Sequence, residues 1–148
     1  MYDIRHRIGI CAPQNEVQRL FATTEGLASW WTTDTKGDAA VGGKLVFTFG
    51  APERSASFEV VEASEDRVAW RGIGGPEEWI NTTFTFDLSR EGDETVVFFT
   101  NAGWREAVPF LGHCTTKWGT FLVGAKSLLE DGRSVSYPDE VVISSWDR

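Results

Sequence analysis

The fold is decided by residues 111–132, LGHCTTKWGTFLVGAKSLLEDG. Apolar side chains recur along this stretch with helical spacing, and on a helical wheel they fall within about 120° of one another. They are Leu111, Cys114, Trp118, Phe121, Leu122, Ala125, Leu128 and Leu129. A stripe of this width predicts a long C-terminal helix that lies against a core, and Gly132 is expected to end it.

Upstream of this helix, the apolar residues alternate as they do in half-buried β-strands. Five strands are expected in succession, over residues 44–49, 55–63, 67–73, 80–88 and 95–101. The segments between them are rich in Gly, Pro, Asp and Ser, which favours hairpins and therefore an antiparallel meander. The alternation leaves open which face of the last strand points inward, because Val96 and Phe98 oppose Val97 and Phe99.

The N-terminal part predicts one further strand and two short helical segments. Residues 4–10 alternate as a strand, Pro13 is suited to the first turn of a helix, and residues 25–31 form a second helical turn. Trp30 and Trp31 diverge by about 100° on a helix, so only one of them is expected to be deeply buried. Residues 133–148 either add a short edge strand or pack as a tail.

This order of elements excludes a doubly wound fold, because no crossover helices alternate with the strands. The sequence therefore predicts a single α+β domain over residues 1–148. In it, a curved six-stranded antiparallel sheet wraps around the long C-terminal helix, the only element whose apolar stripe is long enough to cover the sheet.

Composition excludes several classes of partner. Asp and Glu outnumber Lys and Arg by 22 to 14, and the net charge of −8 argues against nucleic acid. No segment has the length and apolarity needed for membrane insertion. The two cysteines, Cys11 and Cys114, lack metal-ligand spacing, and we expect two reduced and mostly buried thiols in a cytoplasmic protein.

Catalytic and cofactor motifs are absent from the sequence. No phosphate-binding loop, metal-ligand cluster or nucleophile motif is present, so no cofactor, metal or catalytic residue is predicted. His113 and Cys114 are adjacent, but neighbouring helical side chains point about 100° apart, which disfavours a nucleophile and base pair. His6 shares a strand face with isoleucines and is interpreted as a structural histidine.

Several short segments together resemble a known family. They are Glu25-Gly26-Leu27-Ala28-Ser29-Trp30-Trp31, Val41-Gly42-Gly43, Val68-Ala69-Trp70, Gly103-Trp104, His113-Cys114 and Lys117-Trp118-Gly119. In this order they resemble the START-like (SRPBCC) superfamily, and within it the branch that is similar to the C-terminal domain of the activator of heat-shock-protein-90 ATPase. The resemblance extends from Ile4 to about Leu129.

The resemblance implies a helix-grip, Bet v-like architecture with a hydrophobic cavity between the sheet and the terminal helix. Across the superfamily this cavity takes lipids, polyketides, plant hormones and other apolar ligands. Many relatives have a histidine at the end of the last strand, where this chain has Asn101, which argues against an acid–base role there. The resemblance also implies that Phe99 and Asn101 face inward.

The candidate ligand-binding residues are mainly aromatic, as expected for a chain with seven Trp and ten Phe. They are Trp30, Trp31, Phe47, Trp70, Trp79, Phe84, Phe99, Asn101, Trp104, Trp118, Phe121 and Leu122. Polar side chains that could orient a ligand are Asn101, Arg105, His113, Thr115 and Thr82. The sequence leaves open whether the rings line a cavity or fill a solid core.

Three functional hypotheses follow. The first is non-catalytic binding of a small, largely hydrophobic or aromatic molecule. The second is a co-chaperone-like protein that binds a chaperone and regulates its ATPase, or that binds a second copy of itself. The third is a cyclase- or hydrolase-like enzyme, which requires His6, His113 or a carboxylate such as Glu59 to face the cavity as a general base.

Overall fold

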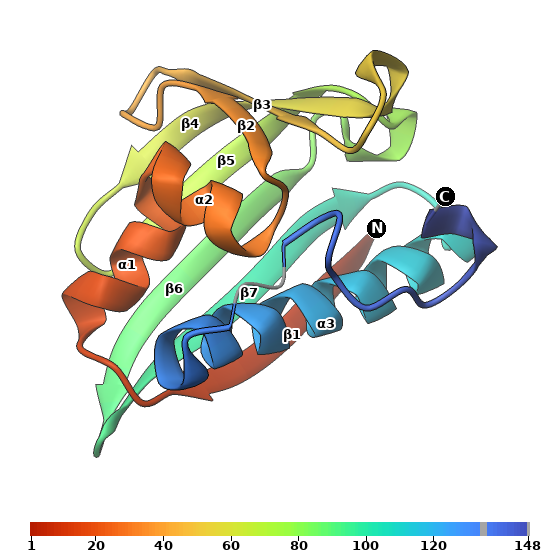
Figure 1. The fold of residues 1–148 in the computed structure, drawn as a ribbon. Coiled ribbons are helices and arrows are strands. Elements are labelled where there is room, and N and C mark those ends of the chain that lie inside the picture. The colour runs from red at the N-terminus through yellow and green to blue at the C-terminus, as the bar shows by residue number, and fades with distance from the viewer. Residues whose placement is uncertain (134–135, 148) are drawn as a thin grey trace.

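A computed structural model describes residues 1–133 and 136–147, and it has the predicted α+β architecture (Figure 1). The strands are β1 (Tyr2–Ile10), β2 (Asp34–Gly37), β3 (Lys44–Thr48), β4 (Ser55–Ala63), β5 (Arg67–Gly74), β6 (Thr83–Glu91) and β7 (Glu94–Trp104). The α-helices are α1 (Gln14–Ala22), α2 (Thr24–Trp30) and α3 (Pro109–Asp131). Short 3₁₀ turns lie at Pro52–Arg54, Glu77–Trp79 and Ser145–Asp147.

The strands form one antiparallel sheet in the order β1-β7-β6-β5-β4-β3-β2. This confirms the predicted meander, but the sheet has seven strands where the sequence predicted six. The additional strand is β2, whose sequence Asp-Thr-Lys-Gly has no apolar alternation. It pairs only with β3 at the edge of the sheet, where both of its faces are largely exposed, so no hydrophobic pattern marks it.

One face of the curved sheet carries the core, and it is covered by α1 and α2 together with α3, which runs along the β1 and β7 side (Figure 1). On β7, Phe99 and Asn101 are fully buried, while Phe98 points outward with the Arg5 guanidinium 5.5 Å from its ring centre. This confirms the inward orientation that the family resemblance implied. Gly132 ends α3 in the left-handed conformation at φ 73°, as predicted.

Two sets of hydrogen bonds hold α3 against the edge strand β1. The ring Nε2 of His6 lies 3.0 Å from the carbonyl oxygen of Thr115, which agrees with a structural role for this histidine. Further along the helix, Lys126 donates to the Gly9 carbonyl at 2.6 Å, and Glu130 accepts from the Cys11 N–H at 2.7 Å. These contacts fix α3 over the β1 and β7 side of the sheet.

Trp30 and Trp31 are both buried, which corrects the expectation that only one of them would be. Their exposed fractions are 0% and 2%, and their rings stack at 5.9 Å with an angle of 8° between planes. The prediction was wrong because the C-terminal end of α2 is enclosed on both sides, and the Trp31 ring packs against Phe47 and Trp70 of the sheet and Trp118 of α3. The two rings therefore share the space between α2, the sheet and α3.

Trp118 lies at the centre of the core and joins α3 to the sheet. Its ring centre is 4.2 Å from that of Phe99 and 5.0 Å from that of Trp31. The predicted apolar stripe of α3 therefore faces the sheet, with Leu122 and Ala125 also buried and Leu111, Leu128 and Leu129 partly buried against the core.

The C-terminal tail folds back along α3 toward the start of that helix (Figure 1). Within residues 136–147 no strand is formed, so the tail packs and does not extend the sheet. Tyr137 nevertheless hydrogen-bonds through its backbone with Trp31 and Thr33. Residues 134, 135 and 148 of the predicted tail lie outside the described residues.

The expectation of two buried thiols was half wrong. Both cysteines are free, and Cys114 is buried, but Cys11 is exposed because it follows the end of β1 and lies outside the core. Among the described residues, no helix is long and apolar enough to cross a membrane.

Trp118 offers a direct test of this packing. Trp118→Ala removes the ring between α3 and the sheet and should lower the free energy of unfolding by about 3–5 kcal/mol. Val123→Ala on the exposed side of the same helix should change it by less than about 0.5 kcal/mol. Urea unfolding followed by circular dichroism measures both, and equal effects would contradict the assigned orientation of α3.

Candidate functional site

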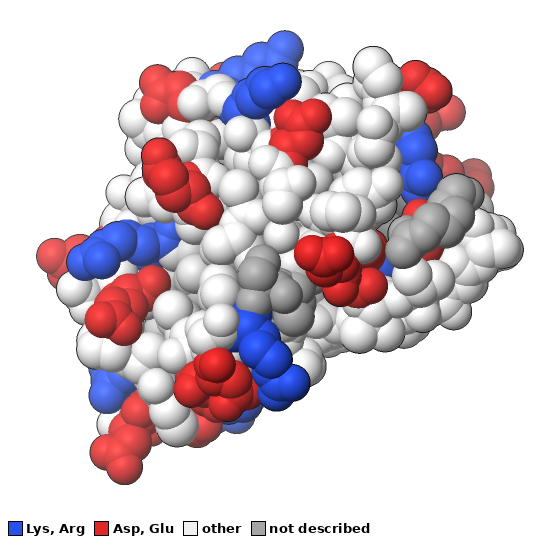
Figure 2. Space-filling view, in the orientation of Figure 1, with Lys and Arg blue, Asp and Glu red and all other residues white. Residues whose placement is uncertain are grey.

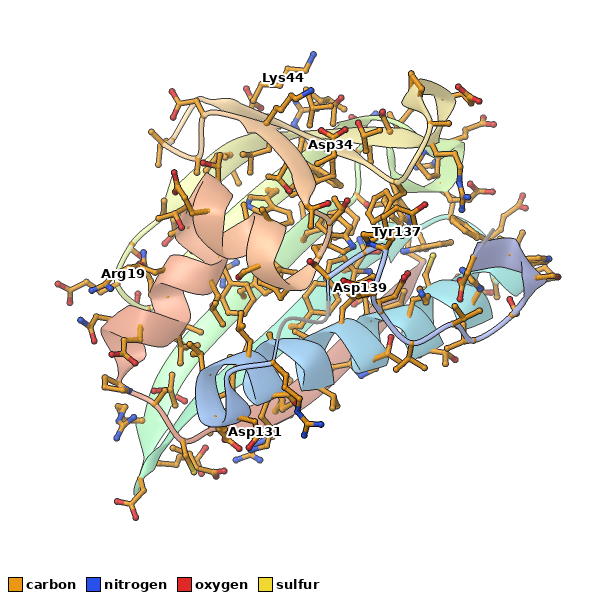
Figure 3. All side chains as sticks on the ribbon, viewed as in Figure 1. Arg19, Asp34, Lys44, Asp131, Tyr137 and Asp139 are labelled. Carbon is orange, nitrogen blue, oxygen red and sulfur yellow. The ribbon has the colours of Figure 1, made fainter. Side chains whose placement is uncertain are left out.

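A pocket of about 470 Å³ lies beside the first half of α3. Its other walls come from the start of β4, the connection between β5 and β6, and the C-terminal tail. In Figure 3, the labelled residues Tyr137 and Asp139 mark where the tail passes α3. The volume is within the range of about 300–1,000 Å³ that small-molecule sites occupy.

Eight aromatic residues line this pocket. They are Trp31, Phe49, Trp79, Phe110, Trp118, Phe121, Tyr137 and Trp146. Several of these rings also contact one another, with 5.0 Å between the centres of Trp31 and Trp118 and 6.2 Å between those of Trp79 and Phe110. The walls are therefore rigid and largely apolar.

One wall of the pocket is polar, because α3 and the tail meet there through charged side chains. The Lys117 ammonium lies 2.9 Å from Glu140 Oε2 and 3.2 Å from Asp147 Oδ2. His113, one helical turn before Lys117, has its Nε2 3.6 Å from Asp147 Oδ1. The side chains of Lys117, Glu140 and Asp147 are only 13%, 5% and 1% exposed, so this is a buried cluster of charges.

Burial and charge shift the pKa values in this cluster. Burial lowers the pKa of His113 below 6.5, against the opposing effect of Asp147 and with a smaller contribution from Lys117. For Asp147, burial favours a higher pKa, but hydrogen bonds from the Ile143 N–H and from Lys117 outweigh it, so the pKa is lowered. At neutral pH the histidine is therefore uncharged and Asp147 is a carboxylate.

Cys114 and Trp79 line the pocket beside each other. Burial raises the pKa of Cys114 to about 12, with the nearby Trp79 N–H lowering it and Glu78 raising it to smaller extents. The thiol is therefore protonated at neutral pH and is no nucleophile, in agreement with its interpretation as a core residue. The Trp79 Nε1 is itself buried, and its N–H lies beside the Cys114 thiol.

Four of the predicted ligand-binding residues reach this pocket: Trp31, Trp79, Trp118 and Phe121. The others lie outside its lining and are packed in the interior, namely Trp30, Phe47, Trp70, Phe84, Phe99, Asn101, Trp104 and Leu122. A ligand role for the predicted set stays a prediction.

Of the predicted polar groups, only His113 lines the pocket. Arg105 donates to the backbone carbonyls of Ile80 and Glu77, and Thr115 donates to the carbonyl of Leu111. Thr82 and Asn101 belong to a separate buried network described below.

The residues that the tail brings to the pocket were not predicted from the sequence: Tyr137, Glu140, Trp146 and Asp147. Lys117, which is next to Trp118 and faces the tail, was not predicted as a site residue either. Two aromatic residues in a short polar tail were the available signal, because such rings seek a packing surface. Within the described part of the chain, no group of His, Cys, Asp and Glu side chains is arranged to hold a metal ion.

Asn101 is the centre of a buried structural network. Its Nδ2 donates to Thr82 Oγ1 at 3.0 Å and to the Thr83 carbonyl at 3.1 Å, and its Oδ1 accepts from Trp104 Nε1 at 2.6 Å. The amide thereby ties the ends of β6 and β7 together. Its hydrogen bonds explain why a polar residue is fully buried here.

Comparisons with known proteins found similar solved structures. No family model matches the chain, and no curated protein matches it. The Aha1 dimer from Colwellia psychrerythraea is 36% identical, with a TM-score of 0.82 over 90% of this chain and 100% of that chain. SSP2350 from Staphylococcus saprophyticus is 17% identical, with a TM-score of 0.75 over 90% and 96%. CalU16 from Micromonospora echinospora is 21% identical, with a TM-score of 0.72 over 89% and 76%. The last two likenesses show a shared fold.

The pKa of His113 predicts a pH dependence of stability. Because this pKa is lower in the folded chain than in the unfolded chain, stability is complete above pH 6.5 and falls as the pH drops below it. Urea unfolding at pH 7.5 and pH 5.5 should show a loss of stability that is smaller in His113→Gln. An equal loss in the variant would contradict the assignment.

The hydrogen bonds of Asn101 should stabilise the folded chain. Asn101→Ala leaves the Trp104 N–H buried without its acceptor, so the free energy of unfolding should fall by about 1–3 kcal/mol. Thr100→Val, on the opposite face of β7, should change it by less than about 0.5 kcal/mol. Thermal and urea unfolding measure both, and an unaffected Asn101→Ala variant would contradict the structural role.

Proposed function

The chain belongs to the Aha1 family of START-like proteins, and on that premise we propose that it binds a small, largely apolar or aromatic molecule without changing it chemically. The proposed site is the pocket between the first half of α3, the sheet and the tail. The observation that carries the proposal is a concave site of suitable volume lined by eight aromatic residues beside a few convergent polar groups.

The interior between α3 and the sheet is filled by packed side chains, which supports the pocket beside the first half of α3 as the ligand site. Between the middle of α3 and the sheet lie four buried rings, each in contact with at least two of the others: Trp118, Phe99, Trp30 and Phe86. An interior filled by rings in contact has little space for a ligand. The pocket lies next to these packed rings, and Trp118 is part of both the packed interior and the pocket lining.

The polar groups support a ligand with one polar end. His113, Lys117, Glu140 and Asp147 form a polar wall at one side of an otherwise largely aromatic site, so the polar end of a ligand would lie against this wall.

An enzymatic function is a second candidate, and the position of His113 favours it. Of the three bases considered from the sequence, His6 contacts the α3 backbone and Glu59 pairs with Arg71 on β5, whereas His113 lines the pocket beside Asp147. An uncharged histidine next to a carboxylate is suited to accept a proton. Turnover of a bound ligand that is abolished in His113→Gln would establish this candidate over simple binding.

Association with protein remains a further proposal from family membership. The relative from Colwellia psychrerythraea is named as a dimer, and the tail of this chain exposes Val141, Val142 and Trp146. Light scattering tests pairing with a second copy, and an ATPase assay with purified heat-shock protein 90 tests the chaperone hypothesis. A monomer that leaves the ATPase rate unchanged would remove both.

Ligand binding can be tested with a neutral aromatic probe, N-phenyl-1-naphthylamine, whose fluorescence rises in apolar sites. We expect binding of one probe molecule per chain, confirmed by native mass spectrometry. Phe110→Ala should weaken it about tenfold, because the lost ring contributes on the order of 1.4 kcal/mol. Phe98→Ala removes a ring from the outer face of the sheet and serves as the matched control. The absence of binding, or equal weakening in both variants, would contradict the proposed site.

A further inference from the structure

We propose that the pocket selects an aromatic ligand that carries an uncharged hydrogen-bond donor, such as a phenolic hydroxyl group, and that the His113 imidazole accepts this hydrogen bond. The inference rests on the proposed function and adds to it the chemical class of the ligand and the residue that determines it. His113 lies in the first turns of α3 and lines the pocket, so its ring can meet a ligand there.

The ring nitrogens of His113 are available to a ligand. Within residues 1–133 and 136–147, neither nitrogen has a hydrogen-bond partner, since Asp147 Oδ1, at 3.6 Å from Nε2, is too distant for one. Neither nitrogen is among the fully buried polar atoms that lack a partner, so both reach accessible space. A ligand in the pocket can therefore supply the hydrogen bond that the protein does not.

Two aromatic rings fix the plane of the His113 imidazole. Phe110 stacks on it with 5.9 Å between ring centres and 13° between planes, and the centre of the Trp146 ring lies 5.3 Å away. Both rings also line the pocket. Because Phe110 covers one face of the imidazole, the edge that carries the nitrogens is the part that can bind a polar ligand group. A side chain held in this way loses little conformational freedom on binding.

The proton of the uncharged imidazole is favoured on Nε2. Burial lowers the pKa of His113, so at neutral pH one ring nitrogen carries a hydrogen and the other a lone pair. Asp147 Oδ1 lies 3.6 Å from Nε2, and a carboxylate attracts an N–H and repels a lone pair. This preference requires only that Asp147 is ionised, which its lowered pKa ensures. Nδ1 is then the acceptor, and a ligand that donates a hydrogen bond satisfies it.

The charged side chains of the same wall are already engaged with one another. The Lys117 ammonium lies 2.9 Å from Glu140 Oε2, 3.2 Å from Asp147 Oδ2 and 3.1 Å from the Val141 carbonyl. These acceptors match the N–H groups of an ammonium, so a ligand that bound Lys117 would have to break one of these contacts. His113 is therefore the group of this wall that can bind a ligand without a loss elsewhere.

An uncharged donor suits this place better than an ionised group. Removing an ion from water costs far more than burying a hydroxyl that forms a hydrogen bond. The burial that keeps His113 uncharged acts equally on a ligand group beside it. Figure 2 shows acidic and basic side chains interspersed on this face of the molecule, so no broad patch of one sign steers a charged ligand. A hydroxyl on an aromatic ring can meet both the aromatic walls and His113.

Two ligands of similar shape test the proposal. 2-Naphthol carries a hydroxyl group, and 2-methoxynaphthalene has a methyl group in place of the hydroxyl hydrogen, so it cannot donate. Both are titrated at pH 7.5 by calorimetry. The ratio of naphthol to methoxynaphthalene affinity should fall at least about fivefold in His113→Phe, because the buried hydroxyl loses its acceptor. Thr116→Val, at an exposed position on the same helix, is the matched control and should leave the ratio unchanged.

Nitrogen NMR of wild-type protein with isotope-labelled histidine gives a second measurement that needs no variant. The chain has two histidines, and His6, whose Nε2 lies 3.0 Å from the Thr115 carbonyl and which is not part of the pocket lining, is the internal reference. The free protein should show the Nε2–H form of His113. 2-Naphthol should shift the Nδ1 resonance of His113 as expected for a hydrogen-bonded acceptor, 2-methoxynaphthalene should not, and the His6 resonances should stay in place.

The outcomes separate the two proposals. If neither naphthalene compound binds, the proposed function itself is wrong. If both bind but their affinity ratio is the same in the wild type and in His113→Phe, ligand binding stands and the role of His113 is wrong. An Nδ1–H form of His113 in the free protein, or an Nδ1 resonance that 2-naphthol does not shift, would also overturn the hydrogen bond. The NMR result decides the matter should circular dichroism show that His113→Phe does not fold.

Discussion

The packing of Trp118 against Phe99, with 4.2 Å between ring centres, is the contact on which the rest of the structure depends. A curved sheet with an aromatic face is unstable in water until another element covers that face, because burial of apolar area is the main favourable term in folding. Helix α3 provides the cover, and Trp118 is the residue through which it reaches the centre of the sheet. The position of this ring determines both the closed interior and the floor of the pocket.

The pocket forms because α3 is hydrogen-bonded along the β1 side of the sheet and lies apart from the start of β4 on the opposite side. Hydrogen bonds from His6 and Lys126 join the helix to the β1 side of the sheet along its length. On the other side, α2 ends and Trp31 fills the adjoining space, but the start of β4 and the first turns of α3 remain apart. The tail covers part of this gap. The pocket therefore forms where a single helix does not extend far enough across the curved sheet to cover it.

The parts of the fold that the sequence predicted are those with a repeating pattern. Period-two alternation located β1 and the strands of the meander, and the stripe around Trp118 located α3. Strand β2 was missed because an exposed edge strand has no buried face to leave a pattern. The part of the site that the tail provides was missed for a related reason. Tyr137, Glu140 and Asp147 lie in an irregular segment, and only tertiary packing brings their side chains to Lys117.

The cluster around Lys117 combines attachment of the tail with the chemistry of the pocket. Burying an ion pair is a poor way to gain stability, because the loss of hydration offsets most of the attraction, and apolar residues of equal volume often stabilise more. What the charges do provide is a defined geometry. Lys117 must meet Glu140, Asp147 and the Val141 carbonyl together, which is satisfied in one register of the tail. Since Lys117, Glu140 and Asp147 also line the aromatic pocket, the interaction that positions the last wall also makes that wall polar. A tail held by apolar contacts alone would close the same space without placing polar groups beside the aromatic rings.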